Sequence, residues 1–307
     1  RIVLMEKGRV VLDTSPDGRV WAADPEAGLV ARIGPNARIT TWAIQATNVA
    51  AQPRPGGAYY VWVSTPAGFS SAPATRRFDS VTRTWSTVDP DAHILWQGSD
   101  PADASGNLFA IREVGPDSQG ITTYTFGAYG PDLTWTEIPL WDGALGAQYI
   151  QRMKAYGKGK LLVAFADGEV WRWDGTSWTD LGQGGGSNAG LGIQGLDLDE
   201  RTGTVWTSGA GGASFRDPRT GLWQRLRITN SSMGDNFPLD LDVAPNGNVY
   251  VTQNVSTDIG GWAAWDGVRW KNNTQLTYGL KGTTDFPFNT AGTNAVTWRS
   301  SNQHLAI

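Results

Sequence analysis

The chain has 307 residues, a formal net charge of −4 and no cysteine, which excludes disulfides and thiolate metal sites. Acidic and basic residues are interspersed without a basic stripe, so nucleic acid is not an expected partner. No apolar run approaches the roughly 18 residues that a membrane-spanning helix needs, so no membrane span is predicted.

The first copy of a repeating unit occupies about residues 12–42. A short alternating run leads to the turn signal Asp17-Gly18 and a strand with Val20-Trp21, and the last strand of the unit carries Trp42. Glycine in the turn supplies a positive φ that most residues adopt only at a cost. Four antiparallel strands in about 40 residues make one twisted sheet, which must stack on copies of itself, as blades do in a β-propeller.

Further copies follow at regular spacing. Three of them cover about residues 48–85, 94–135 and 151–178, and the clearest, 239–270, contains the hairpin signal Asp266-Gly267. The tryptophans assigned to fourth strands are Trp42, Trp85, Trp135, Trp178, Trp223 and Trp270. Their gaps of 43, 50, 43, 45 and 47 residues match the spacing of propeller blades and indicate six complete blades.

The two ends of the chain are expected to share one more blade. Residues 294–307 read as its first two strands, and residues 1–11, with a turn at Lys7-Gly8, read as its third and fourth. This two-plus-two closure leaves no free strand edge. The sequence therefore predicts a single all-β domain over residues 1–307, a seven-bladed β-propeller of four-stranded antiparallel blades.

The repeated motif also resembles a known group. The pattern is Asp-x(0–2)-Gly-x-Val-Trp, then a stretch of small residues and an aromatic-Asp before a Trp. It is seen at residues 17–21 and 202–223, and more loosely at 246–270. This pattern resembles the bacterial two-component regulator propeller repeats, and the chain is also similar to streptogramin-lyase-type seven-bladed propellers. The resemblance implies the fold and, by analogy, a periplasmic or secreted sensing or binding role.

Long loops indicate where a ligand is expected. In a propeller, the loops between blades and those between second and third strands gather on one face, and residues 182–195, 225–238 and 271–293 are such loops. The leading hypothesis is an extracytoplasmic, non-enzymatic module that binds a small molecule or a glycan over the central channel. The alternative of a protein-interaction scaffold stays open, and a monomer is expected.

Aromatic and basic residues outside the repeated set are the candidate glycan ligands. Trp96, Trp141 and Trp298 fall outside the fourth-strand series, and Arg152 and Lys154 belong to a local basic cluster. Tryptophan rings can stack on sugars, and the basic residues can bind an acidic or neutral glycan, although each tryptophan can instead be core packing.

The enzymatic alternative rests on few residues. Histidine is the commonest acid–base catalyst, and the chain has only His93, before the first strand of the third copy, and His304, in a predicted closing strand. His93 is therefore the catalytic candidate. A propeller lyase or lactonase would use His93 or a divalent cation held by carboxylates.

Three aspartates are the candidates for that cation. Asp197, Asp240 and Asp242 could hold Ca²⁺ through carboxylate oxygens at the channel. However, Asp13, Asp197 and Asp242 stand at equivalent positions before turn glycines, which favours a repeated structural role as acceptors of turn amides. Apart from calcium, no cofactor is predicted.

Overall fold

The computed structural model describes residues 11–274, apart from 35, 65–74, 90–91, 96–101, 104, 116–118, 185–191, 232, 234–235, 237 and 254–260. Two short 3-10 turns, η1 (Pro55–Gly57) and η2 (Ala147–Tyr149), are the only helical elements among these residues. Neither these turns nor any other described segment forms a helix long and apolar enough to cross a bilayer.

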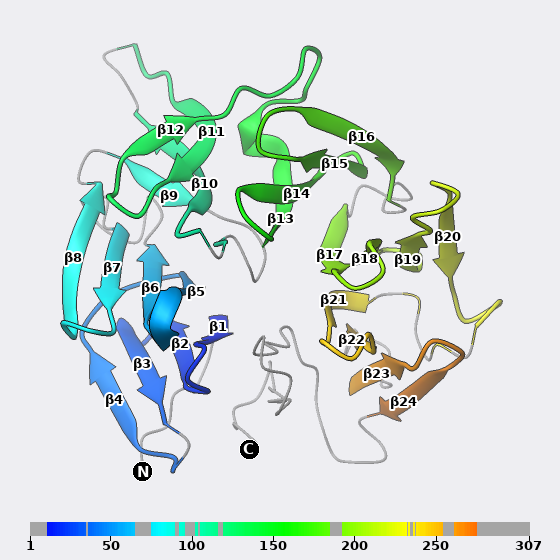
Figure 1. The fold of residues 1–307 in the computed structure, drawn as a ribbon, viewed down its shortest axis with the longest axis horizontal. Coiled ribbons are helices and arrows are strands. Elements are labelled where there is room, and N and C mark those ends of the chain that lie inside the picture. Colours follow the sequence, from blue (N-terminus) through cyan, green and yellow to red (C-terminus); the bar gives the residue numbers. More distant parts are fainter. Residues whose placement is uncertain are drawn as a thin grey trace. The chain divides into compact units, whose positions relative to one another are not determined.

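The strands form six four-stranded sheets, each ordered as in the chain (Figure 1). Each sheet is called a blade, numbered from the N-terminus. The first three blades are β1 (Val11–Thr14), β2 (Val20–Asp24), β3 (Leu29–Ile33) and β4 (Ile39–Trp42); β5 (Asn48–Pro53), β6 (Tyr59–Ser64), β7 (Thr75–Asp79) and β8 (Thr84–Asp89); and β9 (His93–Leu95), β10 (Leu108–Val114), β11 (Thr123–Tyr129) and β12 (Trp135–Glu137).

The last three described blades continue the same pattern. They are β13 (Ile150–Tyr156), β14 (Lys160–Phe165), β15 (Glu169–Trp173) and β16 (Trp178–Gln183); β17 (Ile193–Asp199), β18 (Thr204–Gly209), β19 (Gly212–Arg216) and β20 (Trp223–Leu226); and β21 (Pro238–Val243), β22 (Val249–Gln253), β23 (Gly261–Trp265) and β24 (Trp270–Thr274).

The six-copy prediction is confirmed, and all six tryptophans of the series lie in fourth strands. Trp42 ends its strand, opposite Val30, whereas Trp223 begins its strand, opposite Arg216. Val11, assigned from the sequence to the closing strands, is the first residue of β1. Residues 1–10 and 294–307 lie outside the described residues, so the seventh blade and the two-plus-two closure stay predictions.

The chain divides into two compact units. The N-terminal unit comprises residues 8–161 and 174–178, and the C-terminal unit comprises residues 1–7, 162–173 and 179–307. The first three blades belong to the N-terminal unit, and the fifth and sixth belong to the C-terminal unit. The strands of the fourth blade are divided between the two. Each unit is described by itself below.

In the N-terminal unit, aromatic rings fill the interface between the first and second blades. Trp21 is fully buried and stacks on Trp42, with ring centroids 5.3 Å apart and planes 12° apart. Phe78 and Trp85 of the second blade contact the same ring at 5.0 and 6.3 Å. The Arg32 guanidinium lies 5.7 Å from the rings of both Trp21 and Trp42, within the range of a cation–π contact.

In the C-terminal unit, the fifth and sixth blades pack in the corresponding way, as neighbouring sheets in Figure 1. Buried residues of both blades and of the connection between them form one cluster: Trp206, Ala213, Met233, Leu241, Val249, Val251, Ala263 and Trp270. Phe215 and Trp265 pack against this cluster and remain partly exposed. Hydrophobic burial therefore joins the two blades, while the rings of Phe215 and Trp265 stay partly exposed.

A buried carboxylate joins the first strands at both of these interfaces. Asp13 accepts a hydrogen bond from the backbone N–H of Ala51, and Asp197 accepts one from that of Val243, both at 2.6 Å. The two aspartates occupy the same register position, opposite Trp21 and Trp206 respectively. A structural role for these aspartates is thus confirmed, although the donor is a strand amide of the next blade rather than a turn amide.

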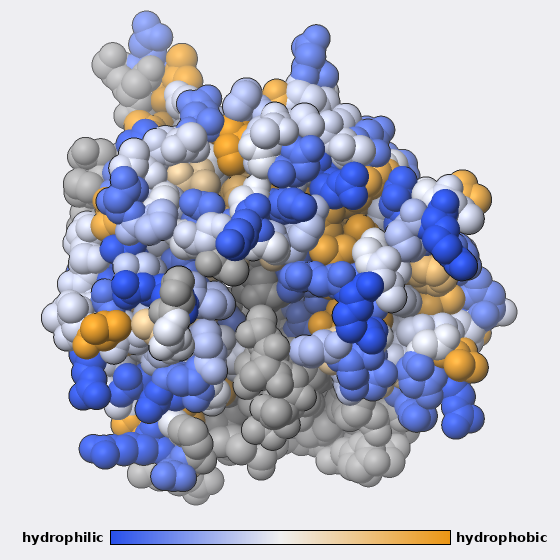
Figure 2. Space-filling model, viewed as in Figure 1, coloured by the Kyte–Doolittle hydropathy of each residue, from blue (hydrophilic) through white to orange (hydrophobic). Residues whose placement is uncertain are grey.

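Large apolar side chains are sparse on the surface. Figure 2 shows hydrophobic residues lying singly or in small groups among hydrophilic ones. Among the described residues, the exposed large apolar side chains include Val81, Leu222 and Val268. Scattered exposure of this kind is ordinary, so an exposed apolar residue has meaning only beside another feature.

Candidate functional site

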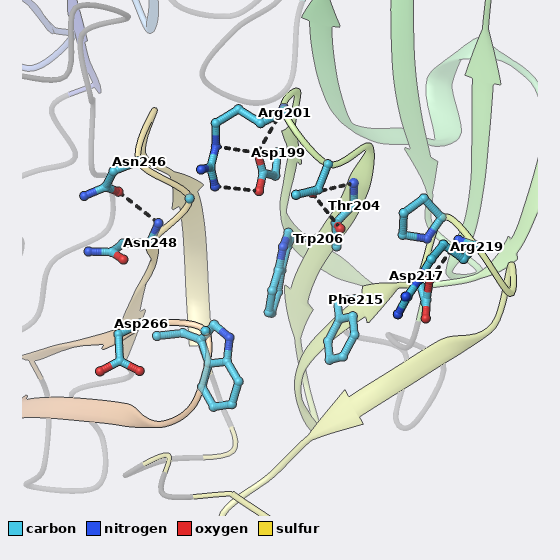
Figure 3. Close-up of a pocket in the computed structure, with 15 residues that line it drawn as sticks. Asp199, Arg201, Thr204, Trp206, Phe215, Asp217, Arg219, Asn246, Asn248 and Asp266 are labelled. Atoms are coloured by element: carbon cyan, nitrogen blue, oxygen red, sulfur yellow. Dashed lines mark hydrogen bonds and ion pairs between the residues drawn. The ribbon is translucent and has the colours of Figure 1, made fainter.

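A cleft of about 630 Å³ opens between the fifth and sixth blades, within the C-terminal unit (Figure 3). Four turns contribute to it, those between the first and second and between the third and fourth strands of each blade. Its volume falls in the range of small-molecule sites, about 300–1,000 Å³. The lining residues are Asp199, Arg201, Thr202, Thr204, Trp206, Phe215, Asp217, Pro218, Arg219, Asn246, Gly247, Asn248, Trp265, Asp266 and Gly267.

Three aromatic rings form the apolar part of the cleft. Trp206 in β18 and Phe215 in β19 are paired across the sheet, so their side chains share one face, and their ring centroids lie 5.0 Å apart. Trp265 comes from β23 of the sixth blade and contacts Trp270 at 5.6 Å. Trp206 is buried, whereas Phe215 and Trp265 are partly exposed. The cleft thus gives a ligand access to aromatic surface from both blades.

The fifth blade contributes two pairs of an aspartate and an arginine. In the β17–β18 turn, Arg201 donates from Nε to Asp199 Oδ1 at 3.2 Å and from Nη2 to Oδ2 at 3.0 Å. In the β19–β20 turn, Asp217 Oδ1 accepts the backbone N–H of Arg219 at 2.8 Å. The Arg219 side chain is only loosely held, with Nε 3.7 Å from Asp217 and 89% of the side chain exposed.

The sixth blade contributes amide and carboxylate groups held by their own turns. Asn246 Oδ1 accepts the backbone N–H of Asn248 at 2.9 Å, and Asp266 Oδ1 accepts those of Val268 and Arg269 at 3.1 and 3.0 Å. Such side chain-to-backbone bonds are the usual device of Asx turns. In Figure 3, Asn246, Asn248 and Asp266 lie on one side of the cleft, facing Trp206 and Phe215 on the other.

The turn amides also fix the charge of these carboxylates. The Arg269 amide, with Lys271 Nζ at 3.2 Å and the Val268 amide, lowers the pKa of Asp266 to about 2. The Arg219 amide lowers the pKa of Asp217 below its usual range. Hydrogen bonds to the ionised form of a carboxyl group stabilise that form. Both groups therefore carry a negative charge at neutral pH.

Glycine at the first turn of the sixth blade is favoured by its positive φ and lies close to the neighbouring turn. Gly247 has a φ of 86°, and a Cβ there would collide with the guanidinium of Arg201. The Arg201–Asp199 pair consequently lies against the backbone of the next blade. This contact joins the two first turns at the edge of the cleft.

Three of the residues predicted as glycan ligands, Trp141, Arg152 and Lys154, lie in the N-terminal unit and do not line the cleft. Trp141 is half-buried in the N-terminal unit and packs on Trp178, with ring centroids 5.4 Å apart. Arg152 and Lys154 alternate along β13, and Arg152 Nη1 donates to the carbonyl of Gln151. Trp96 and Trp298 lie outside the described residues.

The catalytic and metal candidates are placed only in part. The backbone of His93 pairs with Glu113 in the third blade, and its side chain is outside the described part of the structure. Asp197 accepts the Val243 amide, Asp240 accepts the Leu241 amide at 2.9 Å, and Asp242 is buried. Among the described residues, no three His, Cys, Asp or Glu side chains form a group that could hold a metal ion. Catalysis by His93 and calcium binding stay predictions.

The sequence motifs include several residues of the cleft, but they indicate turns and repeat packing rather than a binding site. Asp266-Gly267 and Asn246-Gly247 are turn signals, and Trp206 and Trp265 are structural residues of the repeat. The sequence signal that could locate the cleft is the occurrence of aspartate or asparagine turns together with aromatic residues in two consecutive copies of the repeat. Whether such a place is open or filled depends on side-chain packing that the pattern does not show.

Comparison with known structures identifies the fold. A streptogramin B lyase structure matches 96% of this chain and 91% of its own, with a TM-score of 0.65 and 12% identity. A catalytically inactive virginiamycin B lyase from Staphylococcus aureus, with quinupristin, matches 96% and 93%, with a TM-score of 0.64 and 11% identity. The extracellular domain of a hybrid two component system from B. thetaiotaomicron matches 95% of this chain and 37% of its own, with a TM-score of 0.62 and 11% identity.

These likenesses show that the chain is an all-β propeller, as the repeat resemblance implies. No protein-family model matches the sequence, and no curated protein sequence matches it significantly. At 11–12% identity the structural likeness shows the fold alone, because one fold serves many activities.

Proposed function

We propose that the chain is a non-enzymatic, extracytoplasmic binding module of the sensor type, and that the cleft between the fifth and sixth blades holds a ligand. The observation that carries the proposal is the cleft itself. The rings of Phe215 and Trp265 are partly exposed in it, and its polar groups are held in place by turn hydrogen bonds. A ligand would thus meet a preformed site, which lowers the ordering cost of binding.

The lining residues favour binding over catalysis. Those that the structure describes include no histidine, lysine, cysteine or serine. General acid–base catalysis near neutral pH needs a group whose pKa lies near the working pH. The pKa values of Asp217 and Asp266 are lowered instead, and Asp199 is paired with Arg201. The cleft therefore offers hydrogen-bonding and stacking groups without an evident proton carrier.

The comparisons support the sensor side of this proposal by analogy. The B. thetaiotaomicron structure is an extracellular domain of a two component system, and it matches nearly the whole of this chain. The structural likeness to streptogramin B lyase favours the rival, a propeller lyase that uses His93 or a carboxylate-bound cation. A glycan bound by Trp96, Trp141, Arg152, Lys154 and Trp298 over the channel remains a second proposed ligand site.

Ligand-dependent thermal unfolding tests the proposal. Neutral and acidic oligosaccharides and short peptides would be screened against the chain and against Trp265→Ala, with Trp141→Ala as the matched control. A ligand at about 100 times its Kd adds roughly 2.7 kcal/mol to the free energy of unfolding, a readily measured rise in Tm. We expect a probe that stabilises the chain and the Trp141→Ala variant but not Trp265→Ala.

Two other outcomes would redirect the assignment. Loss of the shift only in Trp141→Ala would move the ligand to the glycan site predicted from the sequence. Conversion of a probe to product, with a fall in turnover of about 100-fold or more in His93→Ala, would replace the binding module with the enzyme.

A further inference from the structure

The N-terminal unit shows what occupies an aromatic interface between blades of this protein. Arg32 lies over Trp21 and Trp42. Between the second and third blades, Arg77 lies 4.0 Å from the Tyr60 ring and 5.4 Å from the Trp62 ring, and Nη1 donates to the carbonyl of Pro131. In both places a guanidinium covers the rings, because its planar cation stacks on the negative faces of aromatic groups.

The open cleft has the same architecture with a different residue at the key position. Arg32 pairs with Trp21 across β2 and β3, and Phe215 pairs with Trp206 across β18 and β19. Asp13 and Asp197 fix the same register in the two blades. Phe215 therefore stands where the first blade has the arginine that covers its tryptophans.

The rings of the cleft have no covering cation among the residues that the structure describes. Within the described part of the chain, no guanidinium or ammonium group lies over Trp206, Phe215 or Trp265. Arg201 is held by Asp199, and the Arg219 side chain is almost fully exposed. The partly exposed rings of Phe215 and Trp265 can therefore contact a ligand in the cleft.

The charge of the lining suits a cation. Among the described residues, the lining has three aspartates and two arginines, and Lys271, outside the lining, pairs with Asp266. Asp217 has the weakest partner of the three, since Arg219 Nε lies 3.7 Å away on a side chain that is 89% exposed. Because Oδ1 already accepts the Arg219 amide, Oδ2 is the oxygen that can accept a charge-assisted hydrogen bond from an incoming guanidinium.

The turns that border the cleft also carry exposed aliphatic side chains. Leu222, at the end of the β19–β20 turn, is 66% exposed, and Val268, in the β23–β24 hairpin, is 82% exposed. These turns supply Asp217 and Asp266 to the lining. Leu222 and Val268 do not line the cleft, so a ligand that reaches them must extend beyond it, as a protein segment does and a free small cation does not.

From these observations we infer that the cleft is a docking site for an arginine side chain on a segment of a partner protein. The guanidinium enters against the partly exposed rings of Phe215 and Trp265 and binds Asp217, and aliphatic neighbours of that arginine contact Leu222 and Val268. The inference rests on the proposed function, since it names the ligand of the same cleft. It assigns to the partner the role that Arg32 has within the first blade.

Binding of a matched pair of peptides tests the inference without altering the protein. The probes are acetyl-Leu-Arg-Leu-amide and its citrulline counterpart, which keeps the shape and loses the charge. Isothermal titration should show the arginine peptide binding about 5- to 30-fold tighter than the citrulline peptide, the difference expected for a cation–π contact in a partly desolvated site. The preference should shrink at high salt because exposed charges are screened.

Variants then place the peptide in the cleft. Phe215→Arg supplies the guanidinium from the chain itself and should abolish binding with little change in Tm, and Asp217→Asn should weaken binding several-fold. Leu222→Ser with Val268→Ser should weaken acetyl-Leu-Arg-Leu-amide but leave acetyl-Gly-Arg-Gly-amide unchanged. A Val81→Ser control, at an exposed apolar residue of the N-terminal unit, should bind both peptides as the natural sequence does.

Three results would overturn the inference: equal affinity for the arginine and citrulline peptides, full binding by Phe215→Arg, or no saturable binding at about 1 mM peptide. The proposed function has a separate test. If another probe still raises the Tm in a manner that requires Trp265, the cleft is a ligand site and only the arginine assignment falls. If no probe depends on Trp265, both fall.

Discussion

The interface between the first and second blades and that between the fifth and sixth share the same strand contacts, but one is filled and the other is open. Both are held by an aspartate that reaches the next blade, and both place a tryptophan opposite that aspartate. In the first interface Trp42 and Arg32 cover the buried Trp21, whereas the second opens into a cleft of about 630 Å³.

Two register positions account for the difference. Trp42 pairs with Val30 in the first blade, and Leu226 occupies the equivalent place opposite Ala213 in the fifth. The ring that stacks on Trp21 thus has an aliphatic counterpart beside Trp206. Together with the exchange of Arg32 for Phe215, this leaves aromatic faces uncovered. A repeated fold can therefore keep its blade contacts and open a cleft through a few substitutions within one row of side chains.

The largest expected effect comes from emptying the filled interface. Trp21→Ala removes a fully buried ring that contacts Trp42 and Phe78, and should lower the free energy of unfolding by about 3–5 kcal/mol. Trp265→Ala removes a partly exposed ring and should cost only about 1 kcal/mol. Urea denaturation followed by circular dichroism measures both. Equal losses would show that the second interface is as closed as the first.

A smaller and equal effect is expected from the two joining aspartates. Asp13→Ala and Asp197→Ala each leave a strand amide without its acceptor, so each should cost about 1–3 kcal/mol in the same denaturation experiment. The Tm of both variants should also be measured with added Ca²⁺ and with a chelator, which tests the predicted metal site. A calcium-dependent rise in Tm that disappears only in Asp197→Ala would support the metal site predicted at Asp197, Asp240 and Asp242.

The smallest expected effect is the pH-dependent contribution of Asp266, in the β23–β24 hairpin at the open interface, to the stability of the fold. The folded-state pKa of Asp266 is about 2, below its ordinary 3.8, so the ionised carboxylate stabilises the fold above about pH 4. This contribution is lost as the pH falls through about 2. Asp266→Asn should therefore melt below the natural sequence at pH 7, and the two Tm values should converge toward pH 2. A difference that persists at pH 2 would mean that the carboxylate charge is not the cause.

The sequence by itself determined the blades of this protein. Turn glycines such as Gly18 and Gly247 mark positions that need positive φ, alternating strands follow them, and the tryptophan spacing counts the copies. These are local signals, since a turn or a strand is decided by neighbouring residues. They placed all six described blades correctly, and the resemblance built on them gave the right fold.

Tertiary structure alone decided where the molecule is open. Trp21 and Trp206 have the same place in the repeat, yet one is covered by Trp42 and Arg32 and the other borders a cleft with Phe215 and Trp265. The outcome depends on the combined volume and charge of side chains from two blades that are distant in sequence, which no pattern within one copy records. The aspartates show the same limit, because the amides that they bind belong to the next blade.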